Sequence, residues 1–574
     1  MERRLFLTLQ MFLLLLATCL AGLGCLRPAL MQFFFIHTSY YILLLLFLFW
    51  ALTLWQYFRT QPLDRYAIVR DYGAGLFVCL LLCISIFLTN TPFLRVLTDE
   101  ATLVSVSQTL AYDRQPLLTV TGIHYGFAFR GLDFMIPQRP LLFPFFIHIL
   151  HVLTGYRVEN AFAFNFIVLF SFLSLLFVWF RKKIGWAQAY TVLFFVAAQP
   201  LVIENASSAG FDLFAAFFLT LGLALTYRLM QEPSALSFQM LWIHLLLLAH
   251  IRYESPLFFV LILVPMILLG YVKKEYFHGS LLYAATPLLL LPIFWQRFLG
   301  QTPYGEIETA PFSLAYFLDH TALFFQLLIG SKISPLGAAF INMLGLAGLV
   351  NFLYLFFKRE WPSSKAARQA FGIALGCLLA FWCILASYYY GNLDRLSCTR
   401  YYVLFYMLLS IFAVLLLSRF KLYEKFSAPM LVGAFLLYLS CHGLSLQKGI
   451  TIELDLPRFH RHAMSFLTRL PRDRNFIVIS DRPVHYTIYN YGAIYFHTAA
   501  KFQAKIADDY YHHLYQDIYV IQEIDRQTGQ PKMHTKLEGN FALTPVYAMQ
   551  YASNELIRIS KAIPAPPEEF NEKA

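Results

Sequence analysis

Charged residues are scarce in this chain of 574 residues: they make up 13% of it, whereas hydrophobic residues make up 59%. Soluble domains usually contain about 25% charged residues, so the composition excludes an ordinary globular enzyme. Continuous apolar runs recur from Leu5 to about Leu446, and a helix needs about 20 apolar residues to cross a bilayer. Because these runs do not alternate as barrel strands do, we predict a polytopic α-helical membrane protein.

The chain also lacks the cysteine spacing of a stapled or zinc-binding domain. Its eight cysteines lie within or beside apolar runs, with no paired spacing outside them. This pattern predicts no disulfide framework and no cysteine-based zinc motif. The net charge of +11 comes from small Lys and Arg clusters between apolar runs, which is how membrane proteins signal orientation. We therefore expect no nucleic-acid partner.

The basic clusters define a topology if they face the cytoplasm. The N-terminus then lies inside, and the apolar body of 5–26 is an uncleaved first span, with a cleaved signal as the alternative. The cluster Arg181–Lys183 must also lie inside, so only one complete crossing, 159–180, fits between Leu94 and Arg181. We predict about 13 spans and an outside C-terminus, with spans near 5–26, 40–58, 73–94, 159–180, 187–203, 211–229, 238–251, 255–271, 280–298, 336–357, 370–388, 401–418 and 427–446.

The interval 95–158 is the first long break in the apolar runs, and this topology makes it an outer loop. It opens with Asp99 and Glu100 directly after a span. Near its end, LLFPFFIHILHVLTG (141–155) is apolar but only about 15 residues long, and it contains His148 and His151. Such a segment suits a helix in the membrane interface rather than a span.

The character of the chain changes near residue 447, where charge and turn residues become common. We predict a transmembrane domain over 1–446, a soluble extracytoplasmic α/β or α+β domain over 447–562, and a disordered tail over 563–574. Within the soluble domain, short apolar runs predict strands and polar-apolar runs predict helices. The strands are expected at 475–480, 493–497 and 517–525, and the helices at 460–470 and 502–516.

Carboxylates and arginines gather on the predicted outer face. Arg binds phosphate through forked hydrogen bonds, and a carboxylate can take the proton of an attacking hydroxyl, so this mixture suits chemistry on a phosphate-linked substrate. The candidate catalytic residues are Asp99 and Glu100. The candidate substrate-binding or phosphate-binding residues are Arg139, Arg157, Arg252, Arg400 and Glu204.

At these residues the chain resembles the GT-C fold integral-membrane glycosyltransferases that use polyprenyl-phosphate-linked sugars, including the protein O-mannosyltransferase and lipid A aminoarabinose transferase branches. The resemblance is carried by TDEATLVSVSQ after a span, RPLLFPFFIHILHVLTGY, ENASSAGFD and HIRYES. It implies that Asp99 is the catalytic carboxylate, with Glu100 adjacent, and that Arg400 faces the lipid phosphate. Many relatives have a doubled proline where this chain has Arg139-Pro140-Leu141.

Each candidate also has a structural explanation. Thr98, Asp99 and Glu100 can form a helix N-cap followed by acids in the first turn. Arg139 and Arg157 can anchor the interfacial helix to headgroups, and Arg400 can anchor the end of a span. Arg252 and Glu254 can form an ion pair at a turn between spans. His148 and His151, three residues apart, can be interfacial histidines rather than metal ligands.

The leading functional hypothesis is a glycosyltransferase that moves a sugar from a polyprenyl-phosphate carrier to a hydroxyl of a lipid, glycan or protein. We expect the reaction to be inverting and metal-independent, and we expect no cofactor. The alternatives are a lipid-linked glycan ligase or polymerase, and a transporter or flippase of lipid-linked sugars. A transporter would tend to show mid-span charges and two related halves. The expected location is the bacterial inner membrane, with the endoplasmic reticulum as the alternative.

Overall fold

The computed structural model separates the chain into two compact units. The helical unit comprises Met1–Phe93, Pro140–Phe146 and Ala161–Ile452, and the sheet unit comprises Leu94–Arg139, Ile147–Asn160 and Glu453–Ala574. The structure describes residues 27–60, 65–125, 128–277, 281–300, 310–329, 336–362, 364–393, 396–420, 422–448, 455–471 and 475–566. The predicted first span, 5–26, and most of the predicted tail therefore lie outside the described residues.

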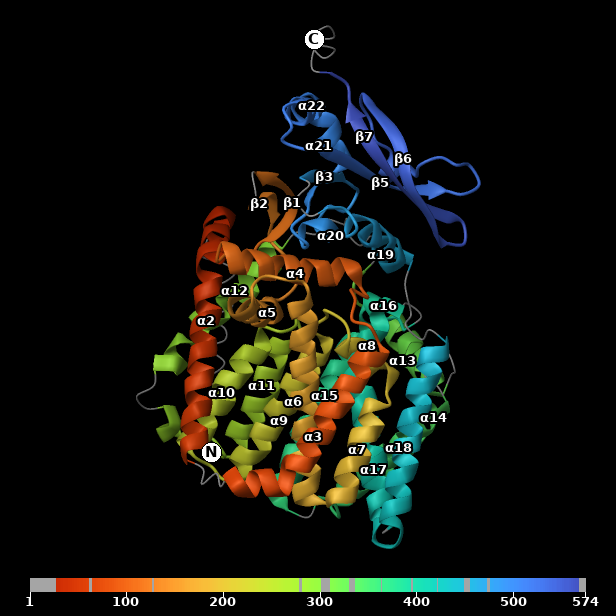
Figure 1. Ribbon diagram of the computed structural model, residues 1–574. Coiled ribbons are helices and arrows are strands. Elements are labelled where there is room, and N and C mark those ends of the chain that lie inside the picture. Colours follow the sequence, from red (N-terminus) through yellow and green to blue (C-terminus); the bar gives the residue numbers. More distant parts are fainter. Residues whose placement is uncertain are drawn as a thin grey trace. The chain divides into compact units, whose positions relative to one another are not determined.

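The helical unit contains helices of membrane-spanning length (Figure 1). In the described part of the chain, seven stretches are long and apolar enough to cross a bilayer. They belong to α2 (Pro28–Thr60), α3 (Arg65–Thr89), α6 (Glu159–Lys183), α9 (Asp212–Gln231), α14 (Leu336–Phe357), α15 (Lys365–Ser387) and α17 (Val403–Arg419), the last continuous with α16 (Leu396–Thr399) and η3 (Arg400–Tyr402). The prediction of a multi-pass helical membrane protein is confirmed.

One predicted span is broken. The segment predicted at 187–203 forms α7 (Trp186–Ala197) and α8 (Pro200–Ala206), which meet at a bend of 73°. Pro200 is the first residue of α8, and proline cannot continue the hydrogen-bond ladder of a preceding helix. Counting the bent pair as one span raises the number of candidate spans in the described residues to eight.

Other helices occupy most of the remaining predicted spans. Those near 238–251, 255–271 and 280–298 correspond to the shorter helices α10 (Ala235–Ala249), α11 (Ser255–Leu268) and α12 (Leu281–Leu299). The span near 427–446 corresponds to α18 (Leu422–Lys448), which has 27 residues and a kink at Phe426. A further apolar helix, α13 (Leu314–Ile329), lies in an interval for which no span was predicted. Length alone does not decide which short helices cross, so the total of about 13 stays a prediction.

The sheet unit is built on a mixed sheet with the strand order β2-β1-β4-β3-β5-β7-β6. The predicted strands are confirmed as β3 (Phe476–Ile479), β4 (Gly492–Ile494) and β5 (Asp517–Asp525), which are parallel neighbours. Four strands were not predicted from the sequence, and all of them join the sheet by antiparallel pairing. They are β1 (Leu118–Tyr125), β2 (Ala128–Met135), β6 (Phe541–Ala552) and β7 (Glu555–Pro564).

Both faces of the central strands are covered. On β3, Val478 packs in one core with α19 (Asp455–Leu467), whereas Ile477 and Ile479 pack in a second core with α21 (Phe496–Lys501) and α22 (Gln503–Tyr511). Side chains alternate between the faces of a strand, so a strand buried on both sides reads as a continuous apolar run. This explains why FIVI was recognisable as a strand.

The first loop contributes directly to this sheet. In Figure 1 the orange strands β1 and β2 continue the blue strands of the C-terminal part, and Gly122 of β1 pairs with Ala493 of β4. The helix α4 (Leu97–Tyr112) is tied to the same part, because the Gln108 amide donates to the carbonyl oxygen of Thr487 at 3.1 Å. The first loop therefore belongs to the same compact unit as the C-terminal residues, and the domain boundary predicted at residue 447 stays a prediction.

The segment predicted as an interfacial helix forms α5 (Leu142–Thr154). Its 13 residues correspond to a length of about 20 Å, which is short of the roughly 30 Å of a hydrocarbon core. The helix itself is therefore as expected, while its position relative to a membrane stays a prediction.

Two glycines on α14 permit close contact with α17. A Cβ added at Gly345 would lie 2.2 Å from the carbonyl oxygen of Leu409, and one at Gly348 would lie 2.3 Å from that of Phe412. Small residues allow membrane helices to approach closely and gain van der Waals contact. A larger residue at either position has to push one backbone away from the other.

We expect Gly345→Ala to lower the free energy of unfolding by about 1–3 kcal/mol, the usual cost of overpacking. Gly376→Ala on α15 is the matched control, because a Cβ there meets nothing within 4 Å. Thermal unfolding in detergent would measure both variants. Equal unfolding midpoints for Gly345→Ala and the wild type would show that the two helices can move apart without loss of stability.

Candidate functional site

The helical unit contains a buried carboxylate at the start of α9. Asp212 is the first residue of this helix, and its side chain is 1% exposed. The preceding turn is held by Asn165 of α6, whose amide donates to the carbonyl oxygens of Ser208 at 2.7 Å and Gly210 at 2.9 Å. A negative charge at a helix N-terminus is favoured by the helix dipole, but a charge this deeply buried also needs direct partners.

Arg252 is the first of these partners. It lies in the turn between α10 and α11, and its guanidinium donates through Nη1 to Asp212 and through Nε to Glu254. The side chains of Arg252 and Glu254 are each 10% exposed. The ion pair expected between Arg252 and Glu254 is confirmed. Its connection to Asp212 was not predicted.

Arg400 supplies the second positive charge. It opens η3, immediately before α17, and its Nε lies 3.4 Å from Oδ2 of Asp212. Its Nη2 donates to the hydroxyl of Tyr401 at 3.3 Å. Two arginines that are separated by 148 positions in the sequence thus meet at one carboxylate, which was itself absent from the predicted site.

Aromatic rings surround the two guanidinium groups. The Arg252 guanidinium carbon lies 5.1 Å from the ring centroid of Tyr401, 5.4 Å from that of Phe211 and 5.7 Å from that of Phe381. The Arg400 guanidinium carbon also lies 5.1 Å from the Tyr401 centroid. Cations are attracted to ring faces within about 6 Å, so these rings help to hold both arginines away from bulk water.

A small pocket opens beside this cluster. Asp212, Arg252, Ser255 and Tyr401 provide its polar lining, and most of the remaining lining is apolar. Within the described residues, the hydrogen bonds of Arg252 use Nε and Nη1 and not Nη2, so N–H donors remain available to an anion. A phosphate group attached to an apolar chain matches this combination of cations and apolar wall.

Asp99 and Arg139 come together within the sheet unit. The Arg139 guanidinium donates to Oδ1 of Asp99 through Nη2 at 2.5 Å and through Nε at 3.1 Å. The Asp99 side chain is 14% exposed. A neighbouring guanidinium favours the ionised form of a carboxylate, which is the form that a general base needs. The proposed catalytic role of Asp99 stays a prediction.

Glu100 is used differently from its neighbour. It is 1% exposed, and its carboxylate accepts hydrogen bonds from the backbone N–H groups of Arg95 at 2.9 Å and Val96 at 3.2 Å. The first turn of a helix leaves such N–H groups without helical partners. Val96 is the N-cap residue and makes no side-chain cap bond, so the Glu100 side chain closes the start of α4.

The other two predicted residues occupy separate places. Arg157 donates through Nη2 to the carbonyl oxygen of Thr154 at 2.8 Å, at the C-terminal end of α5. A cation there suits the helix dipole. Glu204 lies on α8, which packs against η3 and α9 in the helical unit. These contacts do not test whether Arg157 and Glu204 bind substrate, so that role stays a prediction.

His151 belongs to a buried network that explains its presence without a metal. Its Nε2 lies 3.0 Å from Oγ of Ser107, and its Nδ1 lies 2.8 Å from Nδ2 of Asn160. The same amide nitrogen donates to the carbonyl oxygen of Gly155 at 2.9 Å, so Nδ1 accepts and Nε2–H donates to Ser107. Burial lowers the pKa of His151 to about 3. The imidazole is therefore neutral and cannot take a proton from Ser107.

Two solved structures share this architecture. They are crystal structures of ArnT from Cupriavidus metallidurans, one bound to undecaprenyl phosphate and one in the apo state, with TM-scores of 0.53 and 0.51. Each comparison has 13% sequence identity and covers 85% of this chain and 98% of the ArnT chain. The chain has the ArnT fold.

The resemblance to GT-C enzymes is confirmed at the level of architecture. That architecture combines a multi-pass helical part with a mixed sheet. No protein-family profile matches the sequence, and no curated protein matches it. At 13% identity to the ArnT structures, the likeness concerns the fold, and the roles of individual residues need their own evidence.

Two substitutions at Glu100 test its role at the start of α4. Glu100→Ala removes both hydrogen bonds to the start of α4 and should lower the free energy of unfolding by about 1–2 kcal/mol. Glu100→Gln keeps an acceptor oxygen and should lose less. Thermal unfolding measures the difference. If both variants unfold like the wild type, the carboxylate does not stabilise the helix start.

Proposed function

We propose that this protein is a glycosyltransferase that moves a sugar from a polyprenyl-phosphate carrier to a hydroxyl acceptor on a lipid, glycan or protein. The observation that carries the proposal is the buried Arg252–Asp212–Arg400 cluster beside a largely apolar cavity. Its context adds support, because the chain has the ArnT fold and one ArnT structure is bound to undecaprenyl phosphate.

In the proposed reaction the arginines bind the phosphate. Arg252 and Arg400 contact the donor phosphate and stabilise the negative charge that develops on it as the glycosidic bond breaks. Asp212 and Glu254 hold the two guanidinium groups in place before the donor arrives, and no side-chain rearrangement is then needed at the moment of reaction. The apolar wall of the cavity accommodates the first isoprene units.

Asp99 is the proposed general base. It removes the proton from the acceptor hydroxyl, the hydroxyl oxygen attacks the anomeric carbon, and the lipid phosphate leaves with the electron pair of the broken bond. A single displacement inverts the configuration of that carbon. Arg139 donates two hydrogen bonds to this carboxylate and orients it. Arg157, Glu204 and Glu100 are secondary candidates, and no step of this reaction requires a metal.

The proposed location follows from the distribution of basic residues. With about 13 spans and a cytoplasmic N-terminus, the residues after 447 lie outside the cytoplasm. The proposed membrane is the bacterial inner membrane. The donor then enters sideways from the outer leaflet. A cysteine at Gly155 that reacts with a membrane-impermeant reagent from the outside would support this topology, and labelling only from the cytoplasm would overturn it.

The base assignment predicts a large kinetic effect. Asp99→Asn should slow sugar release from the lipid donor by about 10²–10⁴-fold, the usual contribution of general base catalysis. Asp113→Asn is the matched control, because Asp113 is the C-cap residue at the opposite end of the same helix. Release would be measured with purified protein in lipid vesicles. Full turnover by a folded Asp99→Asn protein would exclude Asp99 as the base.

The phosphate site predicts a change in donor affinity. Arg252→Lys keeps the charge but loses the forked donor geometry, so binding of polyprenyl phosphate should weaken about tenfold, or about 1.4 kcal/mol. Arg228→Lys is the control, since Arg228 forms a more exposed ion pair with Glu232 near the other end of α9. Unchanged affinity in Arg252→Lys would place the phosphate elsewhere.

A flux assay separates transfer from transport. If the protein moves lipid-linked sugar across vesicle membranes without forming glycosidic bonds, the transporter alternative is correct. If it forms bonds between two lipid-linked glycans, the ligase or polymerase alternative is correct. The structural feature that favours transfer is the concentration of charge at the ends of α9, α11 and α17.

A further inference from the structure

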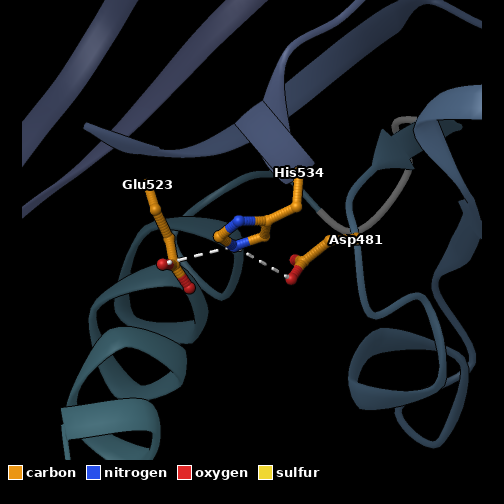
Figure 2. Close-up of side chains that lie close together, drawn as sticks. All are labelled: Asp481, Glu523 and His534. Atoms are coloured by element: carbon orange, nitrogen blue, oxygen red, sulfur yellow. Dashed lines mark ion pairs between the residues drawn. The ribbon is translucent and has the colours of Figure 1, made fainter. Parts of the chain in front are cut away.

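Three side chains with metal-binding atoms converge in the sheet unit, as Figure 2 shows. Asp481 follows the parallel strand β3 by two residues, and Glu523 lies near the end of the neighbouring parallel strand β5. Sites in sheets of this kind commonly form at the carboxyl ends of parallel strands. His534 belongs to the short helix η4 (Met533–Thr535), and its ring points between the two carboxylates.

The three residues are held by the fold around them. The backbone of Glu523 is bound by the side-chain hydroxyl of the fully buried Thr535. This hydroxyl accepts from the Glu523 N–H at 3.3 Å and donates to the Glu523 carbonyl oxygen at 3.1 Å. His534 is the residue before Thr535 and is positioned by this contact. Asp481 is fixed from the other side, because the Ser480 hydroxyl donates to its Oδ1 at 3.3 Å.

The distances suit coordination of one ion. Nε2 of His534 lies 3.5 Å from Oε2 of Glu523 and 3.9 Å from Oδ2 of Asp481, and all three ligand atoms lie within 4.8 Å of one another. Two ligands at about 2.1 Å from a tetrahedral metal are separated by about 3.4 Å. Movements of a few tenths of an ångström to about one ångström would bring the three atoms to that spacing.

The surrounding charges leave room for a divalent cation. Arg482 lies 3.4 Å from each carboxylate, and Lys532 lies 3.2 Å from Glu523. Lys532 also pairs with Glu555, so these two cations face three carboxylates, Asp481, Glu523 and Glu555. The group therefore carries a formal excess of one negative charge.

We propose that Asp481, Glu523 and His534 bind a divalent transition-metal cation of the zinc class, with water at the fourth position. One imidazole nitrogen and two carboxylate oxygens suit zinc, whereas magnesium and calcium prefer oxygen ligands alone. A carboxylate oxygen has two lone pairs, so Arg482 and Lys532 can keep their hydrogen bonds while the metal occupies the other positions. The site is independent of the proposed sugar transfer and serves to join β3, β5 and the η4 turn.

Calorimetric titration of the full-length protein in detergent with Zn²⁺ would test this site. The wild type should bind one Zn²⁺ that His534→Ala either loses or binds at least tenfold more weakly. Magnesium should not compete. His512→Ala is the matched control, because His512 is also exposed and lies 3.1 Å from a single carboxylate oxygen, that of Asp508. Its zinc binding should equal that of the wild type.

Asp481→Asn gives a second, independent variant that removes one ligand charge from the opposite side of the site. It should also weaken zinc binding, and zinc should raise the thermal unfolding midpoint of the wild type more than that of either variant. The proposal is overturned if the wild type binds no zinc, or if His534→Ala binds it as tightly as the wild type. It is likewise overturned if His512→Ala causes the same loss as His534→Ala.

Discussion

Neutralisation of the buried Asp212 carboxylate is the constraint on which the helical unit depends. A carboxylate with 1% exposure is strongly disfavoured unless cations and hydrogen bonds surround it. Arg252 and Arg400 meet that requirement, and in doing so they join the start of α9, the turn between α10 and α11, and the start of α17. Removing either arginine would leave part of the negative charge of Asp212 uncompensated. The need to neutralise this carboxylate therefore fixes the positions of these helix ends and also gathers the cations that can hold an anion.

In the sheet unit, the corresponding constraint is that backbone N–H and C=O groups at strand edges need hydrogen-bond partners. Strand β4 has only three residues, and its neighbours are β3 on one side and β1, from the first loop, on the other. Unpaired strand edges leave hydrogen-bonding groups exposed, so the first loop completes a sheet that the C-terminal residues begin. This pairing also ties α4, and with it Asp99, to residues nearly 400 positions away in the sequence.

Burial and local chemistry explain which strands and site residues were predictable from the sequence. The strand β3 was predictable because burial on both faces makes it continuously apolar, and β5 contains the apolar run IYVI. β6 is largely exposed, and Thr544 and Pro545 interrupt its apolar residues. Asp99 and Glu100 are adjacent and chemically alike, so composition could not separate them. The structure pairs Asp99 with a guanidinium, whereas Glu100 accepts from the N–H groups of the two residues that precede α4.

Long apolar runs and sparse charge determined by themselves that this is a multi-pass helical membrane protein, because a bilayer imposes length and polarity on each segment that crosses it. They also located the arginines and carboxylates at helix ends. The tertiary structure alone decided which of these charges meet, since Asp212, Arg252 and Arg400 are distant in sequence and are brought together by helix packing. It alone also placed His534 between Asp481 and Glu523, because strand order and turn contacts leave no periodic signal in the sequence.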